Sequence, residues 1–506
     1  YGKTTMVLFA DLERSCGDRT VPTNGRNHSN GHLLSVVAVL ITLGVACTQS
    51  PVSDMGITVG EKPGIVRHVT NDDLSQGRLT AEELIAIGKQ LFTTSFNTLD
   101  GSGNSKTRLF SAQTEQSMLN SGFNRISGPD ANACSGCHNL PIVGGGGDNV
   151  ANVFVLAREF PNVNFDGGPG DLFETLTLAT VGNERGTVSM FGSGLIELLA
   201  REMTNDLQNI KGQALRQSAT DQRPVTVPVK SKGVSFGELT AWPDGLVDAS
   251  NVEGIDEDLI VRPFGQKGVY ASLREFTLDA LEVHHGLQGE ERAGTNQDAD
   301  QDGVLNEITI ADTTALTLFQ AALPPPFIKI PTSDMSKAYV QRGEVLFENL
   351  GCSVCHKPYL ELESPIYSEP NPFNPPGTLS DYSIPEIYQI DLFENADSNT
   401  VRRTERGTYL VYAYTDLKRH DMGPILANET IEQRFVDPAS WITRKLWGAI
   451  SEPPFLHHGR ATLVEDAIIA HRGEANSARI NYENLSDDDK AALFEFIKTF
   501  QVSVEP

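Results

Sequence analysis

Hydrophobic residues recur at helical spacing in two matching pairs of segments. Residues 81–92 and 336–347 carry apolar side chains on one face, and both end in the pattern G-x-x-L-F. Residues 309–323 and 486–500 share a hydroxyl residue, an acid three positions later and the stripe A-L-x-x-F in identical register. A hydroxyl N-cap followed by an acid is typical of a helix start. The pattern therefore predicts two halves, each with an opening and a closing helix.

The boundary between the halves follows the first closing helix. Three consecutive prolines occupy residues 324–326, and proline cannot continue a helix. We therefore place one domain at residues 78–326 and a second at residues 331–506. Valine alternates with polar residues or proline over residues 225–229, which predicts a short hairpin in a loop. The chain is expected to be mainly α, with two tandem domains, long loop insertions and a few short strands.

Each half also contains one copy of the motif C-x-x-C-H. The two copies are Cys134, Cys137 and His138 in the first half, and Cys352, Cys355 and His356 in the second. This motif is the attachment signature of a c-type haem: two thiols bond the porphyrin, and the histidine binds the iron as proximal ligand. A single C-x-x-C would also fit a redox or zinc site. Two complete copies in equivalent halves favour two covalent haems in two cytochrome-c-like domains.

A second repeated pattern predicts the ligands on the other side of each iron. The pattern D-A-[LI]-x-x-H-x-G precedes both closing helices and equates His284 with His471. We expect these two histidines to be the distal ligands, with His285 as the competitor in the first half. Met422 is a further candidate, although a core methionine is the simpler interpretation. Arg460 is a candidate partner for a haem propionate, because its planar guanidinium suits a carboxylate.

One acidic loop resembles the first half of an EF-hand. The pattern D-x-D-x-D-G brings alternating carboxylates together, and glycine allows the sharp turn. The twelfth position is threonine instead of glutamate, so a nearby glutamate is expected to substitute for it. The expected ligands of one calcium ion are Asp298, Asp300, Asp302 and Glu307. The alternative is a solvated acidic turn.

Charge restricts the kinds of partner. The net charge of -26 and the pI near 4.8 argue against nucleic acid. They suit a basic electron donor, such as a small cytochrome or a cupredoxin, although an acidic surface also simply keeps a protein soluble. A small donor of this kind is the expected partner.

The N-terminal segment predicts export. Residues 33–46 form an apolar run that is too short to span a bilayer comfortably and fits the core of a signal peptide. The run ends in L-G-V-A-C, a sequence similar to a lipoprotein cleavage box with Cys47 as the lipidated residue; an ordinary signal peptide is the alternative. We therefore expect a leader at residues 1–46, a tether at residues 47–77 and a periplasmic lipoprotein that contacts the membrane only through its lipid.

Together these motifs resemble bacterial di-haem oxidoreductases, a peroxidase-like family also labelled thiol oxidoreductases and related to di-haem cytochrome c peroxidases. The likeness runs from about Leu84 to Phe500. It is carried by residues 133–138, 262–268, 284–288, 298–307, 351–356, 415–417, 420–424, 446–448, 455–461 and 471–475.

The resemblance implies that one haem passes electrons while the other reacts with hydrogen peroxide. The place of His471 is taken in these peroxidases by methionine or another ligand, and histidine lowers the haem potential relative to methionine. No histidine lies between His138 and His284, so the distal histidine of the peroxidases has no counterpart. No catalytic acid or base is therefore assigned.

Two main hypotheses of function remain. The first is a peroxidase-like oxidoreductase, in which a small donor delivers electrons through one haem to peroxide or a similar oxidant at the other. The alternative is a relay without enzymatic activity, in which both haems have two histidine ligands. A weaker third idea is the oxidation of a protein or thiol partner at long range.

Overall fold

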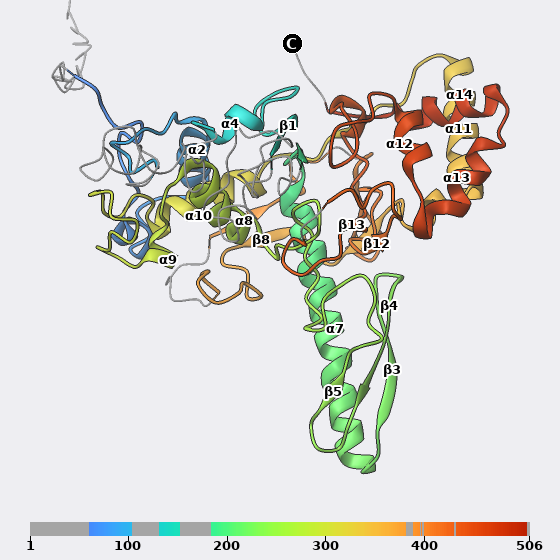
Figure 1. The fold of residues 1–506 in the computed structure, drawn as a ribbon, viewed down its shortest axis with the longest axis horizontal. Helices are drawn as coiled ribbons and strands as arrows, with labels where there is room; N and C mark the ends of the chain where they lie inside the picture. The colour runs from blue at the N-terminus through green and yellow to red at the C-terminus, as the bar shows by residue number, and fades with distance from the viewer. Residues whose placement is uncertain are drawn as a thin grey trace, which may run out of the picture. The chain divides into compact units, whose positions relative to one another are not determined.

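The structure is a computed structural model. It describes residues 60–103, 131–151, 184–380, 388–394, 396, 399–429 and 432–502. The expected leader, Cys47 and the first part of the tether, residues 47–59, lie outside these residues. The unit Glu61–Pro506 contains many helices and several small antiparallel sheets (Figure 1). This agrees with a mainly α fold that also contains strands. Within the described ranges, every helix is too short or too polar to cross a bilayer.

The helices fall into a larger and a smaller group by length. The longer helices are α2 (Ala81–Thr93), α7 (Ser193–Asp221), α8 (Leu273–Ala280), α10 (Ile310–Ala321), α11 (Asp334–Asn349), α13 (Asn476–Glu483) and α14 (Asp487–Ile497). The short ones are α1 (Asn71–Ser75), α4 (Cys134–Cys137), α9 (Glu290–Ala293) and α12 (Val464–Ala470). One π-helical turn, η1 (Leu281–His285), continues α8, and the 3₁₀ turns are η2 (Cys352–Val354), η3 (Ala449–Ser451) and η4 (Gly473–Ala475).

The strands pair into small sheets. The three-stranded sheets are β3 (Val225–Ser231), β4 (Val234–Ala241) and β5 (Val247–Asp248), and β10 (Val401–Arg403), β11 (Tyr409–Val411) and β7 (Leu360–Leu362). The pairs are β1 (Gly147–Ala151) with β2 (Glu184–Thr187), β8 (Ile366–Ser368) with β9 (Gln389–Asp391), β12 (Arg419–Asp421) with β13 (Ser440–Ile442), and β6 (Phe327–Ile328) with β14 (Phe500–Gln501).

The four helices predicted from the repeat are confirmed. They are α2, α10, α11 and α14, and the hydroxyls of Thr309 and Ser486 accept hydrogen bonds from backbone amides at the starts of α10 and α14. The opening helix packs on the closing helix in each pair, α2 on α10 and α11 on α14. The repeat therefore has a physical counterpart in two equivalent helix pairs.

A glycine sits at the same place in both pairs. A Cβ on Gly88 would lie 1.9 Å from the carbonyl oxygen of Ala315, and one on Gly343 would lie 2.1 Å from that of Ala492. The two alanines occupy identical positions in the repeat. Each pair therefore crosses at a point where only a hydrogen atom fits between the two backbones.

The core does not follow the predicted boundary closely. The cluster around α2 and α10 also takes in buried side chains from the second half, namely Leu360, Leu362, Tyr367, Tyr388, Leu392, Val401, Val411, Ala413, Leu417 and Trp447. A separate cluster consists of Phe347, Leu350, Tyr414, Tyr482, Leu493, Phe496 and Phe500. The helix pairs have distinct cores, whereas the sheets after residue 331 share the first one. The division at residues 326 and 331 stays a prediction.

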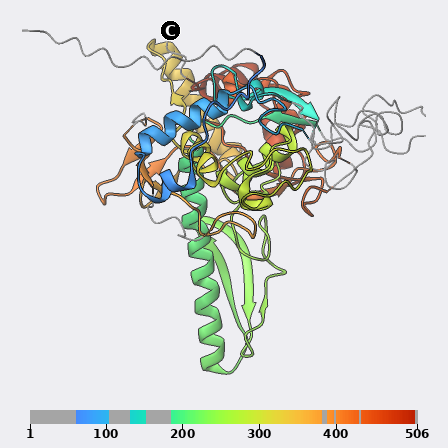
Figure 2. The same cartoon turned by 90° about the vertical axis from the view of Figure 1, so that its left-hand side faces the viewer.

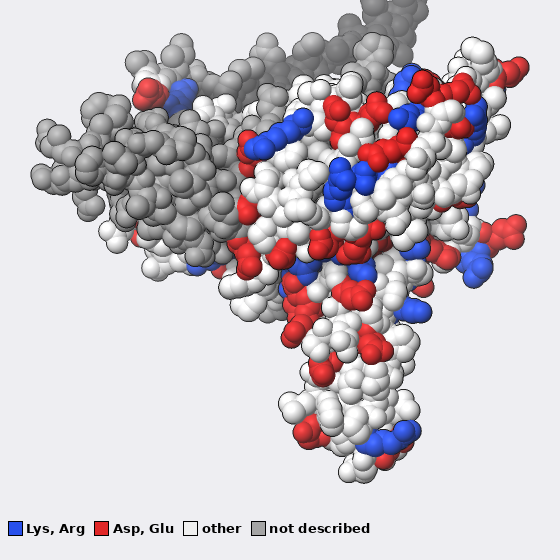
Figure 3. Space-filling view, turned by 45° about the vertical axis from the view of Figure 1, so that its right-hand side comes forward, with Lys and Arg blue, Asp and Glu red and all other residues white. Residues whose placement is uncertain are grey.

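The predicted hairpin is confirmed as β3 and β4. It lies alongside the second half of the 29-residue helix α7, as Figures 1 and 2 show. Val229, Phe236 and Leu239 of the hairpin are buried, as are Leu207 and Ala214 of the helix. The helix and the hairpin thus pack through an apolar seam that is part of the first core cluster. On the face drawn in Figure 3, acidic and basic side chains lie interspersed among uncharged residues.

The contacts of Gly88 and Gly343 predict that alanine at either position destabilises the protein, which is the opposite of its usual effect in a helix. Alanine in place of a helical glycine normally stabilises by about 0.5–1 kcal/mol. We expect Gly88→Ala and Gly343→Ala to destabilise by about 1–3 kcal/mol instead, because the methyl group meets backbone. The measurement is the free energy of unfolding from urea titration.

The matched control is Gly212→Ala in α7. There a Cβ would meet only the end of the Arg216 side chain, at 3.3 Å, and that side chain can move. This variant should be as stable as the wild type or slightly more stable. Equal effects of all three substitutions would rule out a special role for the helix crossings.

Candidate haem sites

The first C-x-x-C-H motif opens into a cavity. Cys134 and Cys137 lie one turn apart on α4, and His138 follows directly. These three residues line a partly open cavity, and His284 and His285 line it from η1. The structure therefore brings together the motif and both distal candidates in this half. The cavity lining is mostly apolar, as a porphyrin ring requires.

His138 has the properties of a metal ligand. Its Nδ1 lies 3.2 Å from the carbonyl oxygen of Gly145 and donates to it, which leaves Nε2 available. Burial lowers the pKa of His138 to about 4, and the positive charge of His284 acts in the same direction. The imidazole is therefore neutral near pH 7, as metal binding requires.

The two distal candidates in this half differ in their contacts. His285 is buried, its Nδ1 donates to the carbonyl oxygen of Ala131 at 2.8 Å, and its Nε2 lies 3.5 Å from the sulfur of Cys134. His284 is less buried and is close enough to His138 to affect its pKa. These contacts favour His284 as the histidine that faces the proximal ligand. Both sit on a π-helical turn, a feature frequent at functional sites.

The second motif faces His471. The ring centres of His356 and His471 are 6.5 Å apart. Two imidazoles that bind one metal through bonds of about 2 Å have ring centres about 6 Å apart. The Nδ1 of His356 lies 3.1 Å from the carbonyl oxygen of Tyr414, and that of His471 lies 2.7 Å from the carbonyl oxygen of Ala467. Each ring therefore keeps Nε2 available for a metal between them.

Burial controls the charge of these two histidines as well. It lowers the pKa of His356 to about 4, with a smaller effect from the charge of His471. Burial also lowers the pKa of His471. Both imidazoles are therefore neutral near pH 7, like His138 in the first half.

The repeated phenylalanine of G-x-x-L-F lies beside each proximal histidine. The ring centres of Phe92 and His138 are 6.1 Å apart, and those of Phe347 and His356 are 6.4 Å apart. The same phenylalanines contact the closing helices, where the ring centres lie 5.2 Å and 5.4 Å from Phe319 and Phe496. The helix crossings thus position an aromatic side chain against both candidate proximal ligands.

The thiols do not have the character of a redox pair. The four described cysteines form no disulfide. Burial raises the pKa of Cys134 to about 12 and that of Cys352 to about 11. Redox-active C-x-x-C motifs instead depend on a lowered thiol pKa. The redox alternative left open by the motif alone is thereby disfavoured.

One wall of the first cavity is cationic. Arg185, Arg444 and Lys445, here called the cationic wall, line it, and no Asp or Glu is among the described residues that do so. Arg185 forms an ion pair with Glu429, and Arg444 Nη2 lies 3.2 Å from Glu452. Sequence reasoning missed these residues because they come from separate segments.

The carboxylates behind this wall do not balance its charge. Glu429 also serves Lys267, whose Nζ lies 3.6 Å away, and Lys445 Nζ donates to the carbonyl oxygen of Phe191 at 3.1 Å. The carboxylate of Asp437 also acts on Lys267, so four cationic side chains face three carboxylates. Burial lowers the pKa of Lys445 to about 7, opposed by Glu452 and reinforced by Arg444. The cavity thus has a surplus of positive charge that an anionic group would relieve.

One short segment serves both sites. Thr443, Arg444 and Lys445 line the first cavity with their side chains or backbone. The backbone of Arg444 also contributes a hydrogen bond that raises the pKa of His356. This segment therefore contributes to both candidate sites.

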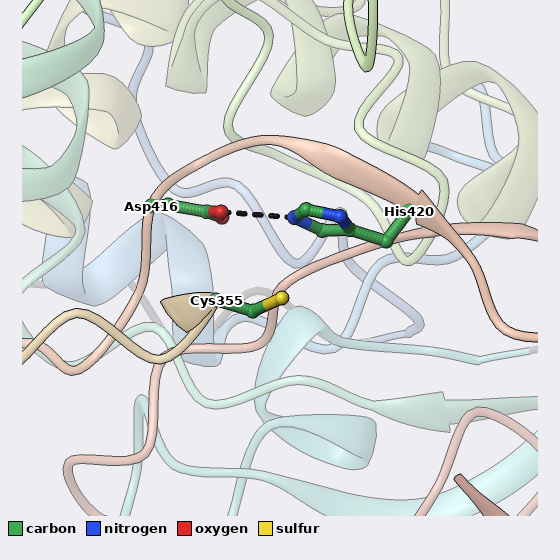
Figure 4. Close-up of side chains that lie close together, drawn as sticks. All are labelled: Cys355, Asp416 and His420. Atoms are coloured by element: carbon green, nitrogen blue, oxygen red, sulfur yellow. Dashed lines mark hydrogen bonds and ion pairs between the residues drawn. The ribbon is translucent and has the colours of Figure 1, made fainter. Parts of the chain in front are cut away.

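His420 lies beside the second motif and was not assigned a role from the sequence. Its Nε2 is 2.9 Å from an oxygen of Asp416, and Figure 4 shows this pair next to Cys355. Burial by itself lowers the pKa of His420, but hydrogen bonds to Asp416 and Cys355 raise it to about 11. A thioether at Cys355 would leave only the carboxylates to hold this positive charge.

The acidic loop is partly as expected. Oxygens of Asp298, Asp300 and Asp302 lie within 4.8 Å of one another. Burial raises the pKa of Asp300 to about 7, together with the negative charges of its two neighbours. Glu307 does not belong to this group: it is buried and accepts the backbone amide of Gln288 at 2.8 Å.

Two other sequence candidates lie outside the cavity lining. The Arg460 side chain is 61% exposed and lies 2.6 Å from Glu184, so its guanidinium already has a carboxylate partner. Met422 is partly buried and is not among the lining residues of the first cavity.

Each C-x-x-C-H motif has a further histidine nearby, which is the arrangement that the expected haem sites require. Residues 404–500 match the family model described as "Di-haem oxidoreductase, putative peroxidase". This match confirms the predicted resemblance to the di-haem oxidoreductase family and covers His420, His471 and α14.

The remaining comparisons add little. A structure of hydrazine synthase from Kuenenia stuttgartiensis is similar at 12% identity and a TM-score of 0.32, covering 93% of this chain and 100% of that chain. No conclusion is drawn from a similarity of this size. The comparison with curated proteins gave no match.

The contacts of Trp441, which lies next to the cationic wall, predict how the stability of the protein depends on pH. The ring of His457 stacks on it at 3.6 Å, and Lys267 Nζ lies 3.5 Å from its centre. Burial lowers the pKa of His457 to about 2, and the positive charges of His458 and Arg185 act in the same direction. An unfolded histidine has a pKa near 6.5. The unfolded chain therefore binds a proton below that pH that the folded chain does not bind.

We expect His457→Phe to reduce the loss of stability in acid. The wild type loses stability as the pH falls below 6.5, whereas phenylalanine keeps the stacked ring and cannot be protonated. Between pH 7 and pH 4.5 the difference in the free energy of unfolding should change by roughly 1–3 kcal/mol. Urea titrations of both proteins at several pH values measure this, and parallel pH profiles would contradict the assignment.

Proposed function

We propose that this chain is an exported di-haem c-type cytochrome that works as a peroxidase-like oxidoreductase. The observation that carries the proposal is the pairing of each motif histidine with a second histidine, most directly His356 with His471 at 6.5 Å. Bound haem would supply one-electron transfer and the reduction of peroxide. Reduction of one hydrogen peroxide to two waters takes up two electrons and two protons, and a reduced small donor supplies the electrons one at a time.

The protein residues divide the work between the two sites. Cys134, Cys137 and His138 would hold the haem of the first site, and Cys352, Cys355 and His356 that of the second. His284 and His471 would be the distal ligands. The first site is the better candidate for the reaction with peroxide, because its cavity is partly open and its polar groups lie near the ring position.

The alternative is an electron relay with two bis-histidine haems. The neutral, well-oriented histidines on both sides of the second site support it as strongly as they support the enzyme. The two proposals differ in whether His284 leaves the iron, since a reacting haem needs an open position.

The cationic wall supports a further part of the proposal. A haem carries two propionate groups, and the wall and its neighbours have more cations than carboxylates. Arg185, Arg444 and Lys445 are therefore proposed to bind the propionates of the first haem in place of Arg460. Bidentate pairing suits the guanidinium groups, and the ammonium of Lys445 contributes a point charge.

Calcium at Asp298, Asp300 and Asp302 is a separate proposal. The raised pKa of Asp300 reflects like charges held close together, which a cation would relieve. We expect calcium to raise the midpoint of thermal unfolding of the wild type but not of Asp300→Asn, with Asp334→Asn as an exposed acidic control. The same rise in Asp300→Asn as in the wild type would exclude this loop.

Export, lipid attachment at Cys47 and a small cytochrome or cupredoxin donor stay predictions from the sequence. The residues that concern export and the lipid lie outside the described part of the chain. The prediction of export is consistent with the proposal, because c-type haems are attached after export.

Spectroscopy and turnover test the central proposal. Protein from a host with c-type maturation should retain two porphyrins after acid–acetone extraction. A half-reduced sample should show a high-spin, peroxide-sensitive haem in its EPR spectrum and should oxidise a reduced small cytochrome with peroxide. Two low-spin haems that do not react with peroxide in any redox state would leave only the relay, and a colourless protein would contradict both.

The cationic wall predicts a shift of potential. Lys445→Met removes a positive charge from the edge of the first haem and should lower its midpoint potential by tens of millivolts, roughly the effect of one unit charge at about 8 Å inside a protein. The control is Lys490→Met, whose side chain lies near Glu465 and Tyr482 in the second half. Redox titration followed in the visible spectrum measures both, and equal potentials would exclude Lys445 from the haem edge.

A further inference from the structure

His420 is held between two carboxylates on different segments. Its Nδ1 lies 2.7 Å from Oε2 of Glu474, and its Nε2 lies 2.9 Å from Oδ2 of Asp416. The side chain is only 9% exposed. Both ring nitrogens therefore donate at once, which makes the ring a charged bridge between the two acids.

One of the two segments carries His471, the candidate distal ligand of the second site, and the other holds His356, the candidate proximal ligand, through a backbone carbonyl. Asp416 follows Tyr414, whose carbonyl oxygen accepts the Nδ1 proton of His356. Glu474 lies three residues after His471. His420 itself lies beside Cys355 (Figure 4). One side chain thus connects the attachment cysteine, the segment that orients the proximal histidine and the loop that carries the distal one.

The loop that follows His471 is held to β12 by further contacts. The second oxygen of Glu474, Oε1, accepts the backbone amide of Asp421 at 2.9 Å. A Cβ on Gly473 would lie 2.1 Å from the carbonyl oxygen of Asp421, so the two backbones are in direct contact. Gly473 also has a positive φ of 49°, which a side chain would strain. The loop therefore depends on Glu474 and on this close approach for its position.

We propose that Glu474, His420 and Asp416 form a latch that holds the His471 loop in the ligand-binding position. His420 is a positioning residue in this arrangement: it does not touch the iron, and it decides how readily His471 leaves it. The proposal rests on ligation by His471, which is part of the proposed function.

The chemistry of the latch explains why it is effective. Hydrogen bonds between a charged imidazole and a carboxylate are about twice as strong as neutral ones. Glu474 can be opened without disturbing the core, because about half of its side chain is exposed. Loss of the Glu474 carboxylate weakens both the charged hydrogen bond to His420 and the hydrogen bond from the amide of Asp421. The loop then moves more freely, and the distal ligand dissociates more often.

The main experiment compares Glu474→Gln with Glu483→Gln. Glu483 is a matched control, since its side chain is 41% exposed and pairs with Arg479 on the same helix, α13. His471→Ala serves as the reference that identifies the signal of the second haem. The measurements are the EPR spectrum of the oxidised holoprotein and the rate at which cyanide binds to the second haem.

We expect Glu474→Gln to raise the rate of cyanide binding about tenfold or more, the factor expected for one charged hydrogen bond, and to add a high-spin signal. Glu483→Gln should match the wild type. His420→Asn should produce the same change as Glu474→Gln, and the double variant should add nothing further, because all three disrupt one unit.

The outcomes separate the latch from the function it rests on. If His471→Ala leaves the low-spin signals unchanged, His471 is not a ligand and the proposed function of the second site fails. If His471→Ala removes one low-spin signal while Glu474→Gln and His420→Asn behave like Glu483→Gln, the latch alone is overturned. Additive effects in the double variant would also overturn it. If circular dichroism shows that His420→Asn misfolds, Glu474→Gln alone decides.

Discussion

The contact between an opening and a closing helix determines the packing around the histidine of each C-x-x-C-H motif. At Gly88 and Gly343 the backbones meet with room for only a hydrogen atom. This spacing brings the phenylalanine one turn later against both the closing helix and the proximal histidine. A larger residue at either glycine would move the phenylalanine, and with it the packing around the histidine. The same arrangement occurs twice, which indicates that it is the repeated structural unit of the chain.

The two candidate haem sites are alike in their ligands and different in their surroundings. Both have a proximal histidine fixed by a backbone carbonyl and kept neutral by burial. The first opens into a cavity with a cationic wall, whereas the second is held by charged contacts around its distal loop. The segment Thr443–Lys445 belongs to both. This division of properties is what a protein needs if one haem is to react and the other is to remain coordinated.

Local patterns in the sequence predicted the repeated parts well. The four helices, the N-caps of the two closing helices, the hairpin at β3 and β4 and the gathering of the three aspartates followed from spacing alone, and the match over residues 404–500 agrees with the resemblance. The meeting of His356 with His471 was anticipated from a repeat of eight residues. The helices, the hairpin and the aspartates depend on neighbours within a few turns of the chain, which is the range that periodicity reports, whereas the histidine pair followed from the repeat between the two halves.

Features that depend on tertiary contacts were not predictable in this way. Arg185 and Lys445 approach one cavity from positions 260 residues apart, and no spacing rule connects them. Arg460 was the obvious arginine near a haem-like motif, but it pairs with Glu184 at the surface. The π-helical turn that carries His284 and His285 directly continues α8, and no spacing rule predicts it. The proposed role of His420 depends on its hydrogen bond to Glu474, 54 residues later in the chain.

The surplus of positive charge in the first cavity also affects how the chain matures. Before any porphyrin is present, like charges brought together in a medium of low polarisability raise the free energy of the compact state. An anionic group held at Cys134 and Cys137, as proposed for the first haem, would offset this repulsion. Binding of the proposed haem would then stabilise the compact state of the chain.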